Sequence, residues 1–285
     1  MSSDGTTPYP PRVPHEPFTL GSFEIVPLCD GWAPLPLEDE APGHDVDWEG
    51  QRSLYPWAFP PDGTANWAWH VHAHLIRHPA GAVLVDTGIG DFGRPPFDVV
   101  GRLDAELAAS GVAPEEVRHV ILTHLHADHA GAASLPDGGP RFPNARYHVH
   151  PDDWTFFAEH RTPDDFTGRF SMAGLRELGL LDLDPSDRDV LPGVSLRYAP
   201  GHTPGHRVVR VDDGGNTMLL VGDLLHTPPQ VSHPTWRSNH DEDPELAAQH
   251  RAIWIETARR ERWAVCVSHF GHPFGHVRDE GWASH

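Results

Sequence analysis

The chain of 285 residues carries 41 acidic against 21 basic side chains, which gives a formal net charge of −20 at pH 7. This acidic excess argues against a nucleic-acid partner, because a protein that neutralises phosphates needs a surface of lysine and arginine. Only Cys29 and Cys266 are present, so we expect no disulfide framework, and a reducing cytoplasm fits. No window approaches about eighteen uninterrupted apolar residues, so we expect no membrane-spanning helix.

Residues 1–17 are rich in proline and polar side chains and do not resemble a secretory signal. We expect a Pro-rich tail there and one domain over residues 18–285. Apolar or alternating runs predict strands over residues 18–28, 67–77, 83–86, 117–122, 146–149, 194–198, 207–211, 217–221 and 263–267. Amphipathic runs predict helices over residues 97–110, 151–160, 170–178 and 244–262. Strands followed by helices, in two successive halves, indicate a sandwich of the α+β class.

The most informative segment directly follows the expected strand 117–122. It reads Thr-His-Leu-His-Ala-Asp-His-Ala-Gly and places His124, His126, Asp128 and His129 within six positions. At the end of a strand, the first two histidines can face one point while Asp128 and His129 face a neighbouring point. Imidazoles and carboxylates are ligands for zinc, and also for iron or manganese. The spacing therefore predicts two adjacent metal ions rather than a loop that is merely rich in histidine.

Three motifs downstream each place one more candidate ligand after an apolar run. His202 lies in Pro-Gly-His-Thr-Pro-Gly-His, Asp223 ends Leu-Leu-Val-Gly-Asp, and His269 ends Val-Cys-Val-Ser-His. Upstream, residues 82–88 read Ala-Val-Leu-Val-Asp-Thr-Gly. With these motifs the chain resembles the metallo-β-lactamase superfamily over about residues 18–277. The resemblance implies a single α+β domain with an αββα sandwich.

The resemblance also implies how the ligands are shared between two metals. One metal would be held by His124, His126 and His202, and the second by Asp128, His129 and His269, with Asp223 bridging both. Two divalent ions are implied, with zinc preferred and iron, manganese or cobalt as alternatives. They would lower the pKa of a bridging water, so that hydroxide attacks the substrate carbonyl at neutral pH. Asp128 would also orient this hydroxide or shuttle its proton.

The last ligand and its neighbours leave a choice open. His272 and His276 follow closely behind His269. We prefer His269 because it directly follows the expected strand, and we assign His272 to the substrate side because the proline after it favours an extended or turn conformation. His206 has the same open status beside His202, and its alternative role is a hydrogen bond that orients the loop or a ligand.

His226 lies three residues after Asp223, where some lactonases of the family carry a tyrosine that touches the substrate carbonyl. We expect His226 to act in catalysis, by donating a hydrogen bond there or by protonating a departing alkoxide. The alternative role is that of a hydrogen-bond partner for Asp223.

Residues 30–66 contain many prolines and large aromatic side chains, and we expect a long irregular loop there. The loop could arch over the metals, with Trp32, Trp57 and Phe59 as an apolar wall for a substrate tail. Simple packing of the loop is the alternative.

The strand around residue 70 presents His70, His72 and His74 on one face. These histidines could form a further metal site, but we expect them to face polar neighbours, solvent or the pocket. Their role stays open.

Short matches, among them Gly-Asp-Leu-Leu-His at residues 222–226, are similar to the lactonase and organophosphate hydrolase branch of the family. We predict a metal-dependent hydrolase that opens a lactone or related ester, like the acyl-homoserine lactonases that act in quorum quenching. The alternatives are a phosphotriesterase, a thioesterase of glyoxalase II type and a mononuclear iron persulfide dioxygenase. The expected partner is a small-molecule substrate with an apolar portion, and the branch is compatible with a homodimer.

Overall fold

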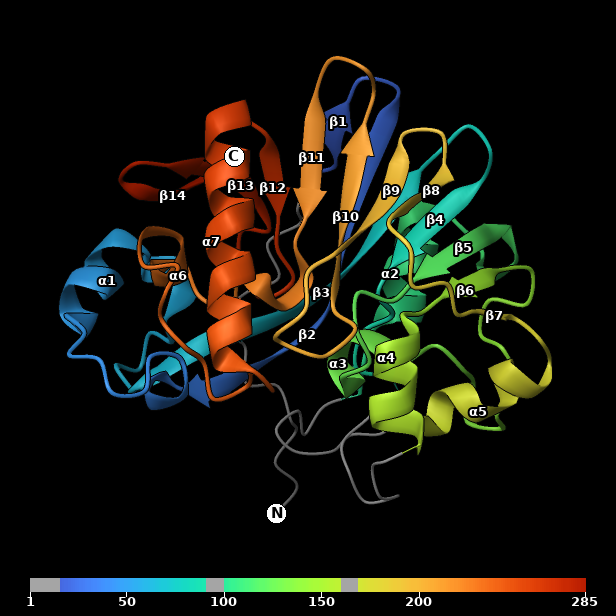
Figure 1. The fold of residues 1–285 in the computed structure, drawn as a ribbon, viewed down its shortest axis with the longest axis horizontal. Helices are drawn as coiled ribbons and strands as arrows, with labels where there is room; N and C mark the ends of the chain where they lie inside the picture. The colour runs from blue at the N-terminus through green and yellow to red at the C-terminus, as the bar shows by residue number, and fades with distance from the viewer. Residues whose placement is uncertain (1–15, 91–99, 160–168) are drawn as a thin grey trace.

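Two seven-stranded sheets face each other in the computed structural model, which describes residues 16–90, 100–159 and 169–285 (Figure 1). The first sheet contains, side by side in chain order, β1 (Phe18–Leu20), β2 (Phe23–Pro36), β3 (Asn66–Arg77), β4 (Ala82–Val85), β5 (Val117–Ile121), β6 (Arg146–His148) and β7 (Leu181–Asp182). The second contains, also in chain order, β8 (Arg188–Leu191), β9 (Val194–Tyr198), β10 (Arg207–Asp212), β11 (Thr217–Leu220), β12 (Ala264–Cys266), β13 (Phe274–Arg278) and β14 (Gly281–Ser284).

The helices lie in the connections between strands. They are α1 (Trp48–Leu54), α2 (Leu103–Ser110), α3 (Ala127–Ala130), α4 (Pro151–Asp153), α5 (Arg169–Glu177), α6 (Pro229–Ser232) and α7 (Pro244–Glu261). Helix α2 ends at Gly111, whose φ of 74° provides a left-handed C-terminal stop. Helix α7 begins at Asp243, whose side chain accepts a hydrogen bond from the Leu246 amide at 3.0 Å.

The apolar side chains form three layers. An inner layer between the sheets includes Ile76 and Val85 of the first sheet and Val209 and Leu220 of the second. Helix α2 packs on the outer face of the first sheet, and α7 packs on the outer face of the second. The order helix, sheet, sheet, helix confirms the predicted αββα sandwich.

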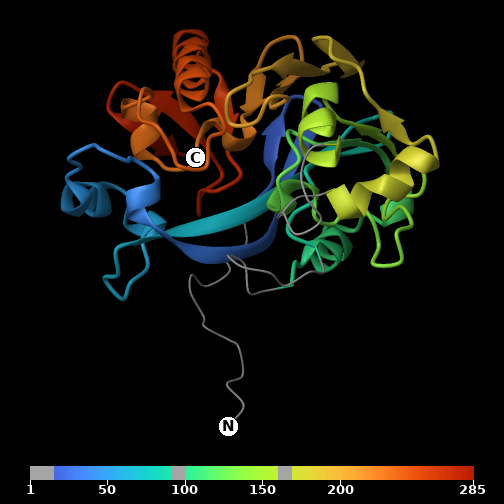
Figure 2. The ribbon, with the colours of Figure 1, turned by 60° about the horizontal axis from the view of Figure 1, so that its bottom comes forward.

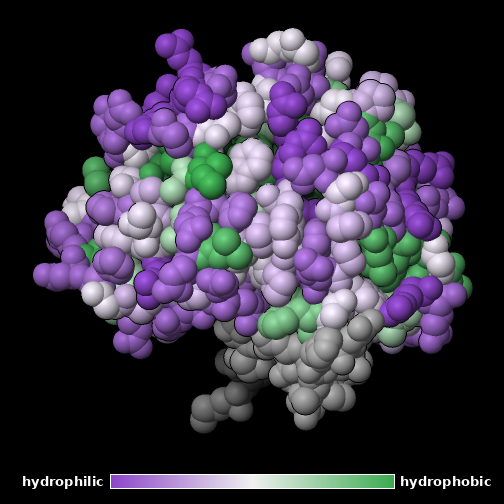
Figure 3. Space-filling view, in the orientation of Figure 1, coloured by the Kyte–Doolittle hydropathy of each residue, from purple (hydrophilic) through white to green (hydrophobic). Residues whose placement is uncertain are grey.

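On the face shown in Figure 3, hydrophilic side chains cover most of the surface and hydrophobic ones are scattered among them. Among the described residues no helix has the length and apolar character needed to cross a membrane.

Each strand expected from the sequence has a counterpart in the structure, whereas β7, β8, β13 and β14 were not expected. Glycine at positions 275 and 281 and histidine at 276 interrupt the apolar pattern of the last two strands. The expected helices at 151–160 and 170–178 correspond to α4, which continues as a π-helical turn over Trp154–Glu159, and to α5. Residues 1–15 of the expected tail, 97–99 of the first expected helix and 160 of the second lie outside the described residues.

The segment 30–66 is more ordered than the expected irregular loop. Strand β2 continues to Pro36 and stays in register with β3, where Pro36 lies opposite Asn66. Beyond β1, this part of β2 is the edge of the sheet, and an edge strand tolerates prolines that cannot donate to a ladder. Figure 2 shows these two long strands crossing below the second half of the chain toward α1.

Candidate metal centre

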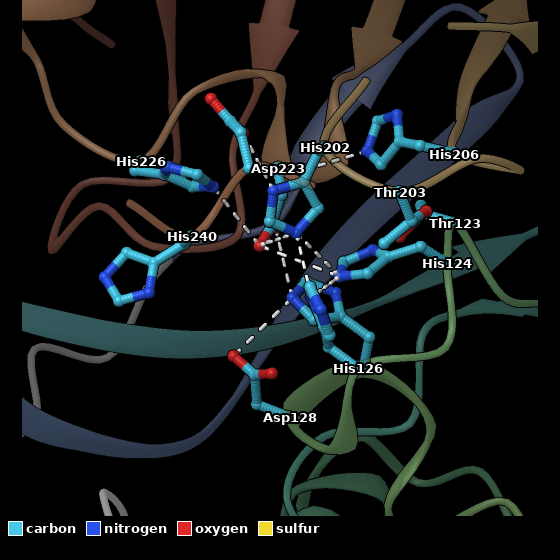
Figure 4. A network of polar contacts seen from close by, with 12 residues as sticks. Thr123, His124, His126, Asp128, His202, Thr203, His206, Asp223, His226 and His240 are labelled. Carbon is cyan, nitrogen blue, oxygen red and sulfur yellow. Dashed lines mark hydrogen bonds and ion pairs between the residues drawn. The ribbon is translucent and has the colours of Figure 1, made fainter. Parts of the chain in front are cut away.

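Loops from both sheets converge at one edge of the sandwich. Strands β4 and β5 run parallel, as do β11 and β12. Their carboxyl ends therefore deliver the turns that follow to the same edge. The segment after β5 carries the histidine-rich motif, and the turns after β9 and β11 bring in His202 and Asp223 (Figure 4). The turn after β12 brings in His269.

A first group consists of His124, His126 and His202 with Asp223, each offering a ligand atom within 4.8 Å of the others. His126 Nδ1 lies 3.0 Å from His124 Nε2 and 2.9 Å from His202 Nε2. The two Nε2 atoms are 3.2 Å apart. Nitrogens that share a tetrahedral zinc ion at bonds of about 2.0–2.1 Å lie about 3.3–3.4 Å apart, so the three rings fit one cation.

A second group consists of Asp128, His129 and His269. The Nε2 atoms of the two histidines are 3.3 Å apart, and Asp128 Oδ2 lies 3.6 Å from His129 Nε2. Asp223 lies between the two groups. Its Oδ1 is 3.1 Å from His129 Nε2 and 3.0 Å from His269 Nε2. Its Oδ2 is 3.3 Å from His202 Nε2. This carboxylate therefore faces both sets of nitrogens.

Acceptors behind the rings orient three of these histidines. The Nδ1 atom of His129 lies 2.8 Å from Asp86 Oδ2, and that of His202 lies 3.0 Å from Asp241 Oδ1. The Nδ1 atom of His269 lies 2.6 Å from the backbone oxygen of His70. An Nδ1–H donated to such an acceptor leaves the Nε2 lone pair directed into the cluster, which is how metal-binding histidines are usually held.

The electrostatics of the cluster favour a cation. Burial holds the pKa of His124, His126 and His202 well below the usual value, so these rings are neutral. Burial also opposes protonation of His129, but Asp223, Asp128 and Asp86 outweigh it and raise its pKa well above the usual value. Three carboxylates around one ring are an excess of negative charge that two dications would compensate.

The buried carboxylate of Asp153 holds two of the loops together. Asp153 accepts hydrogen bonds from the Leu125 amide at 3.2 Å, the Thr203 hydroxyl at 3.0 Å and the Gly205 amide at 2.5 Å. Burial raises its pKa to about 7. Asp153 thus joins the loop of His124 to the loop of His202.

His206 makes two hydrogen bonds beside the cluster. Its Nδ1 lies 3.0 Å from the backbone oxygen of Ala199, and its Nε2 accepts a hydrogen bond from the Asp223 amide at 3.1 Å. This pair of bonds fixes the turn that carries Asp223.

His226 is fully buried beside the cluster. Its Nε2 lies 3.6 Å from Asp223 Oδ2 and its Nδ1 lies 3.5 Å from Glu40 Oε2. Burial disfavours the charged ring, but Asp223 and Glu40 together raise its pKa to about 10. The other oxygen of Glu40 lies 3.4 Å from His240 Nε2. Sequence reasoning missed Glu40 because it lies 186 positions before His226 in a segment that carries no ligand motif.

The structure separates His269 from the two histidines behind it. His269 lies in the second group, whereas the half-buried ring of His272 lies edge-on to Trp57, with 5.2 Å between centroids. His276 is on β13, with its Nδ1 3.2 Å from the backbone oxygen of Trp263. Of these three histidines, His269 is the one that lies in the second group, and its role as the last ligand stays a prediction.

Of the aromatic residues expected to line a pocket, Phe59 is 1% exposed and packs on Trp67, with 4.5 Å between ring centroids. It belongs to the core over the second sheet, which accounts for its position without a contact to substrate. Trp32 and Trp57 are half-buried. The aromatic ring against the cluster is instead Trp69, 4.1 Å from His269 and 5.2 Å from His226 between centroids. Its position in the alternating strand gave no signal of this contact.

The chain is similar in sequence to a known family and to several characterised proteins. The profile of the metallo-beta-lactamase superfamily matches residues 66–269. The N-acyl homoserine lactonase AttM of Azorhizobium caulinodans is 30% identical over 179 residues, which are 54% of this chain and 64% of that protein. The N-acyl homoserine lactonase AiiA of Bacillus thuringiensis subsp. kurstaki is 26% identical over 216 residues, 70% of this chain and 80% of that protein. The chain therefore spans just under two thirds of the length of AttM.

Solved structures share the fold. The hydrolase AbOPH of the beta lactamase superfamily has a TM-score of 0.80 at 22% identity, over 94% of this chain and 96% of that chain. AidC, a dizinc quorum-quenching lactonase solved with a product, has a TM-score of 0.81 at 21% identity, over 95% of this chain and 97% of that chain. At these identities the likeness establishes the fold alone.

The choice of the last ligand can be tested by metal content. We expect His269→Ala to bind about one metal equivalent fewer than the wild-type chain, because it removes a donor of the second group, and His272→Ala to keep the wild-type metal content. Elemental analysis of the purified variants after dialysis measures this. Loss of metal from His272→Ala with retention in His269→Ala would reverse the assignment.

The role of Asp86 can be tested without removing any ligand. In Asp86→Asn an amide hydrogen can face His129 Nδ1 in place of an acceptor oxygen, so we expect metal affinity to fall by about 10- to 100-fold. Competition with a chromophoric chelator measures the change. Asp104→Asn is the matched control, because this carboxylate is exposed and pairs with Arg141 rather than with a histidine of the cluster. Equal affinities in the two variants would show that Asp86 does not support the site.

Proposed function

The chain belongs to the metallo-β-lactamase superfamily, and from this premise we propose that it is a metal-dependent hydrolase that opens acyl lactones or closely related esters. The observation that carries the proposal is the position of Asp223, whose carboxylate lies between the two groups of histidine nitrogens. Its Oδ1 is 3.1 Å from His129 Nε2, and its Oδ2 is 3.3 Å from His202 Nε2 and 3.1 Å from His269 Nε2. The relatives AttM and AiiA, both N-acyl homoserine lactonases, support a lactone as the substrate class.

The donor set suits a dinuclear zinc centre. His124, His126 and His202 would hold one ion and Asp128, His129 and His269 the other, with Asp223 shared between them. Bound there, the ions would supply a water of lowered pKa and would polarise the carbonyl of the substrate. The rings of His124, His126 and His202, which burial keeps neutral, are in the form that binds such ions. A metal on His129 would displace the proton that the surrounding carboxylates favour there.

Asp128 and His226 are the side chains that would handle protons. The Asp128 side chain is 10% exposed, whereas those of His129 and Asp223 are 1% and 3% exposed. Asp128 therefore lies on the open side, where its carboxylate would accept the proton of the attacking water and pass it to solvent. His226 lies against Asp223 on the other side, where an N–H would donate to the carbonyl oxygen or to the departing alkoxide.

The surroundings of His226 and His269 favour a substrate with an apolar part. Trp69 is 4% exposed and lies against both rings. Its indole would keep water from this side of the reacting ester and makes this side of the site apolar. This aromatic surface supports carbonyl substrates over small, fully charged ones.

The proposed activity can be tested by proton release from acyl-homoserine lactones of increasing acyl length. We expect turnover that is lost in an aliquot depleted of metal by a chelator and regained on adding Zn²⁺, because the nucleophile depends on the ions. A phosphotriester and a thioester of matched acyl size serve as comparison substrates. A kcat/KM larger for either of these than for every lactone would overturn the lactonase proposal and leave a hydrolase of another specificity.

The contribution of Glu40 can be tested by neutralising it. In Glu40→Gln the carboxylate behind His226 is lost, so we expect kcat to fall about tenfold or more while KM and metal content change little. Glu38→Gln is the matched control, because Glu38 is an exposed acid in the same turn. An unchanged kcat in Glu40→Gln, or an equal loss in Glu38→Gln, would remove this pair from the mechanism.

A further inference from the structure

Another group of metal-binding side chains lies on β2 and β3, outside the centre described above. It consists of Cys29, His70 and His72, whose thiol sulfur and ring nitrogens lie within 4.8 Å of one another. Cys29 lies directly opposite His72 in the antiparallel ladder, so the two side chains share a face. His70 lies on the same face two positions along β3. We propose that these three residues form a third metal site, and that its ligand is Zn²⁺.

The ring of His72 is oriented as a ligand would be. Its Nδ1 lies 3.0 Å from the backbone oxygen of Ser268. Donation of Nδ1–H to this carbonyl leaves the lone pair on Nε2, as for His129, His202 and His269 in the centre. The tautomer needed for coordination is therefore favoured by a bond to the backbone.

The donor set selects the class of metal. One thiolate and two imidazoles suit Zn²⁺ and other borderline ions, whereas Mg²⁺ and Ca²⁺ require oxygen ligands. Donors on one zinc ion lie about 3.3–3.6 Å apart, given Zn–S of about 2.3 Å and Zn–N of about 2.0–2.1 Å. The donors, which lie within 4.8 Å of one another, would move closer on binding, and the half-buried Cys29 side chain is the least enclosed of the three. The thiol would release its proton to solvent on binding.

Three residues leave one tetrahedral position, which water would fill. His70 and His72 are 6% and 1% exposed, and the same face of β3 continues to the fully buried Ile76 of the inner layer. Access is therefore from the side of Cys29, on the edge strand β2. The site is thus shielded on one side and open on the other.

This site would be joined to the hydrolase centre through the backbone. The amide of His70 donates to His269 O at 3.3 Å, and the amide of His72 donates to Ser268 O at 3.1 Å. His269 returns a bond from its Nδ1 to His70 O at 2.6 Å. A cation on His70 and His72 would therefore brace the segment that carries His269.

The test uses the fact that only this site has a sulfur donor. Metal-free protein is loaded with Co²⁺, which replaces zinc and gives an intense near-ultraviolet absorption when bound by thiolate. We expect three equivalents of Co²⁺ and this absorption in the wild-type chain. We expect two equivalents and loss of the absorption in Cys29→Ser. Cys266→Ala is the matched control, because Cys266 is fully buried on β12, and it should keep both the absorption and the third equivalent.

A second measurement needs no variant. Because Cys266 is buried, a chromogenic thiol reagent should react with Cys29 alone in the folded chain. We expect added Zn²⁺ to slow this reaction at least tenfold. Two equivalents of Co²⁺ without thiolate absorption, absorption that persists in Cys29→Ser, or thiol reactivity indifferent to Zn²⁺ would each overturn the proposal. These readouts report on sulfur and are independent of whether the chain hydrolyses lactones.

Discussion

The arrangement at the edge of the sandwich depends on one buried carboxylate. Asp223 is 2% exposed, and its oxygens lie within 3.3 Å of nitrogens from three separate loops. Burial would raise the pKa of this carboxyl, but His129 and His269 outweigh it and hold the pKa well below the usual value. The charge of Asp223 can persist there only because these rings surround it, so the loops are held in register by the same interactions that create the site.

The supporting groups follow from this constraint. Each imidazole must present a lone pair to the cluster, and a ring can do so reliably only when its other nitrogen has an acceptor. Asp86, Asp241 and the His70 carbonyl provide these acceptors from three different parts of the chain. Asp241 is itself held by the buried Arg251, whose guanidinium lies 3.2 Å from its carboxylate. The same guanidinium donates to the backbone oxygens of Leu224 and Trp236. Residues that would not touch a metal therefore also position the ligand histidines.

Local motifs explain why much of the site could be predicted from the sequence. His124, His126, Asp128 and His129 are contiguous, and His202, Asp223 and His269 each follow an apolar run, so the pattern itself locates them after strands. Parallel strands then bring those ends to one edge. Glu40 and Trp69 could not be found in this way. Their contacts with His226 arise from tertiary packing between distant segments, and neither position breaks the local pattern around it.

The same reasoning explains the misjudged segment after residue 30. Its prolines suggested a loop, because proline cannot donate to a ladder, yet the edge position of β2 beyond β1 needs no donor on its open side. Edge position is a property of the assembled sheet and is invisible in the local sequence.

Strand β3 illustrates how one strand can contribute to two sites. Its alternation places Trp69 on the face toward His269 and His226, while His70 and His72 lie on the opposite face with Cys29. The backbone between these faces donates to Ser268 and His269. A change on either face can therefore reach the segment of His269 through three hydrogen bonds as well as through side-chain packing. In this arrangement the position of the last proposed ligand depends on β3 as much as on the strand β12 that precedes it.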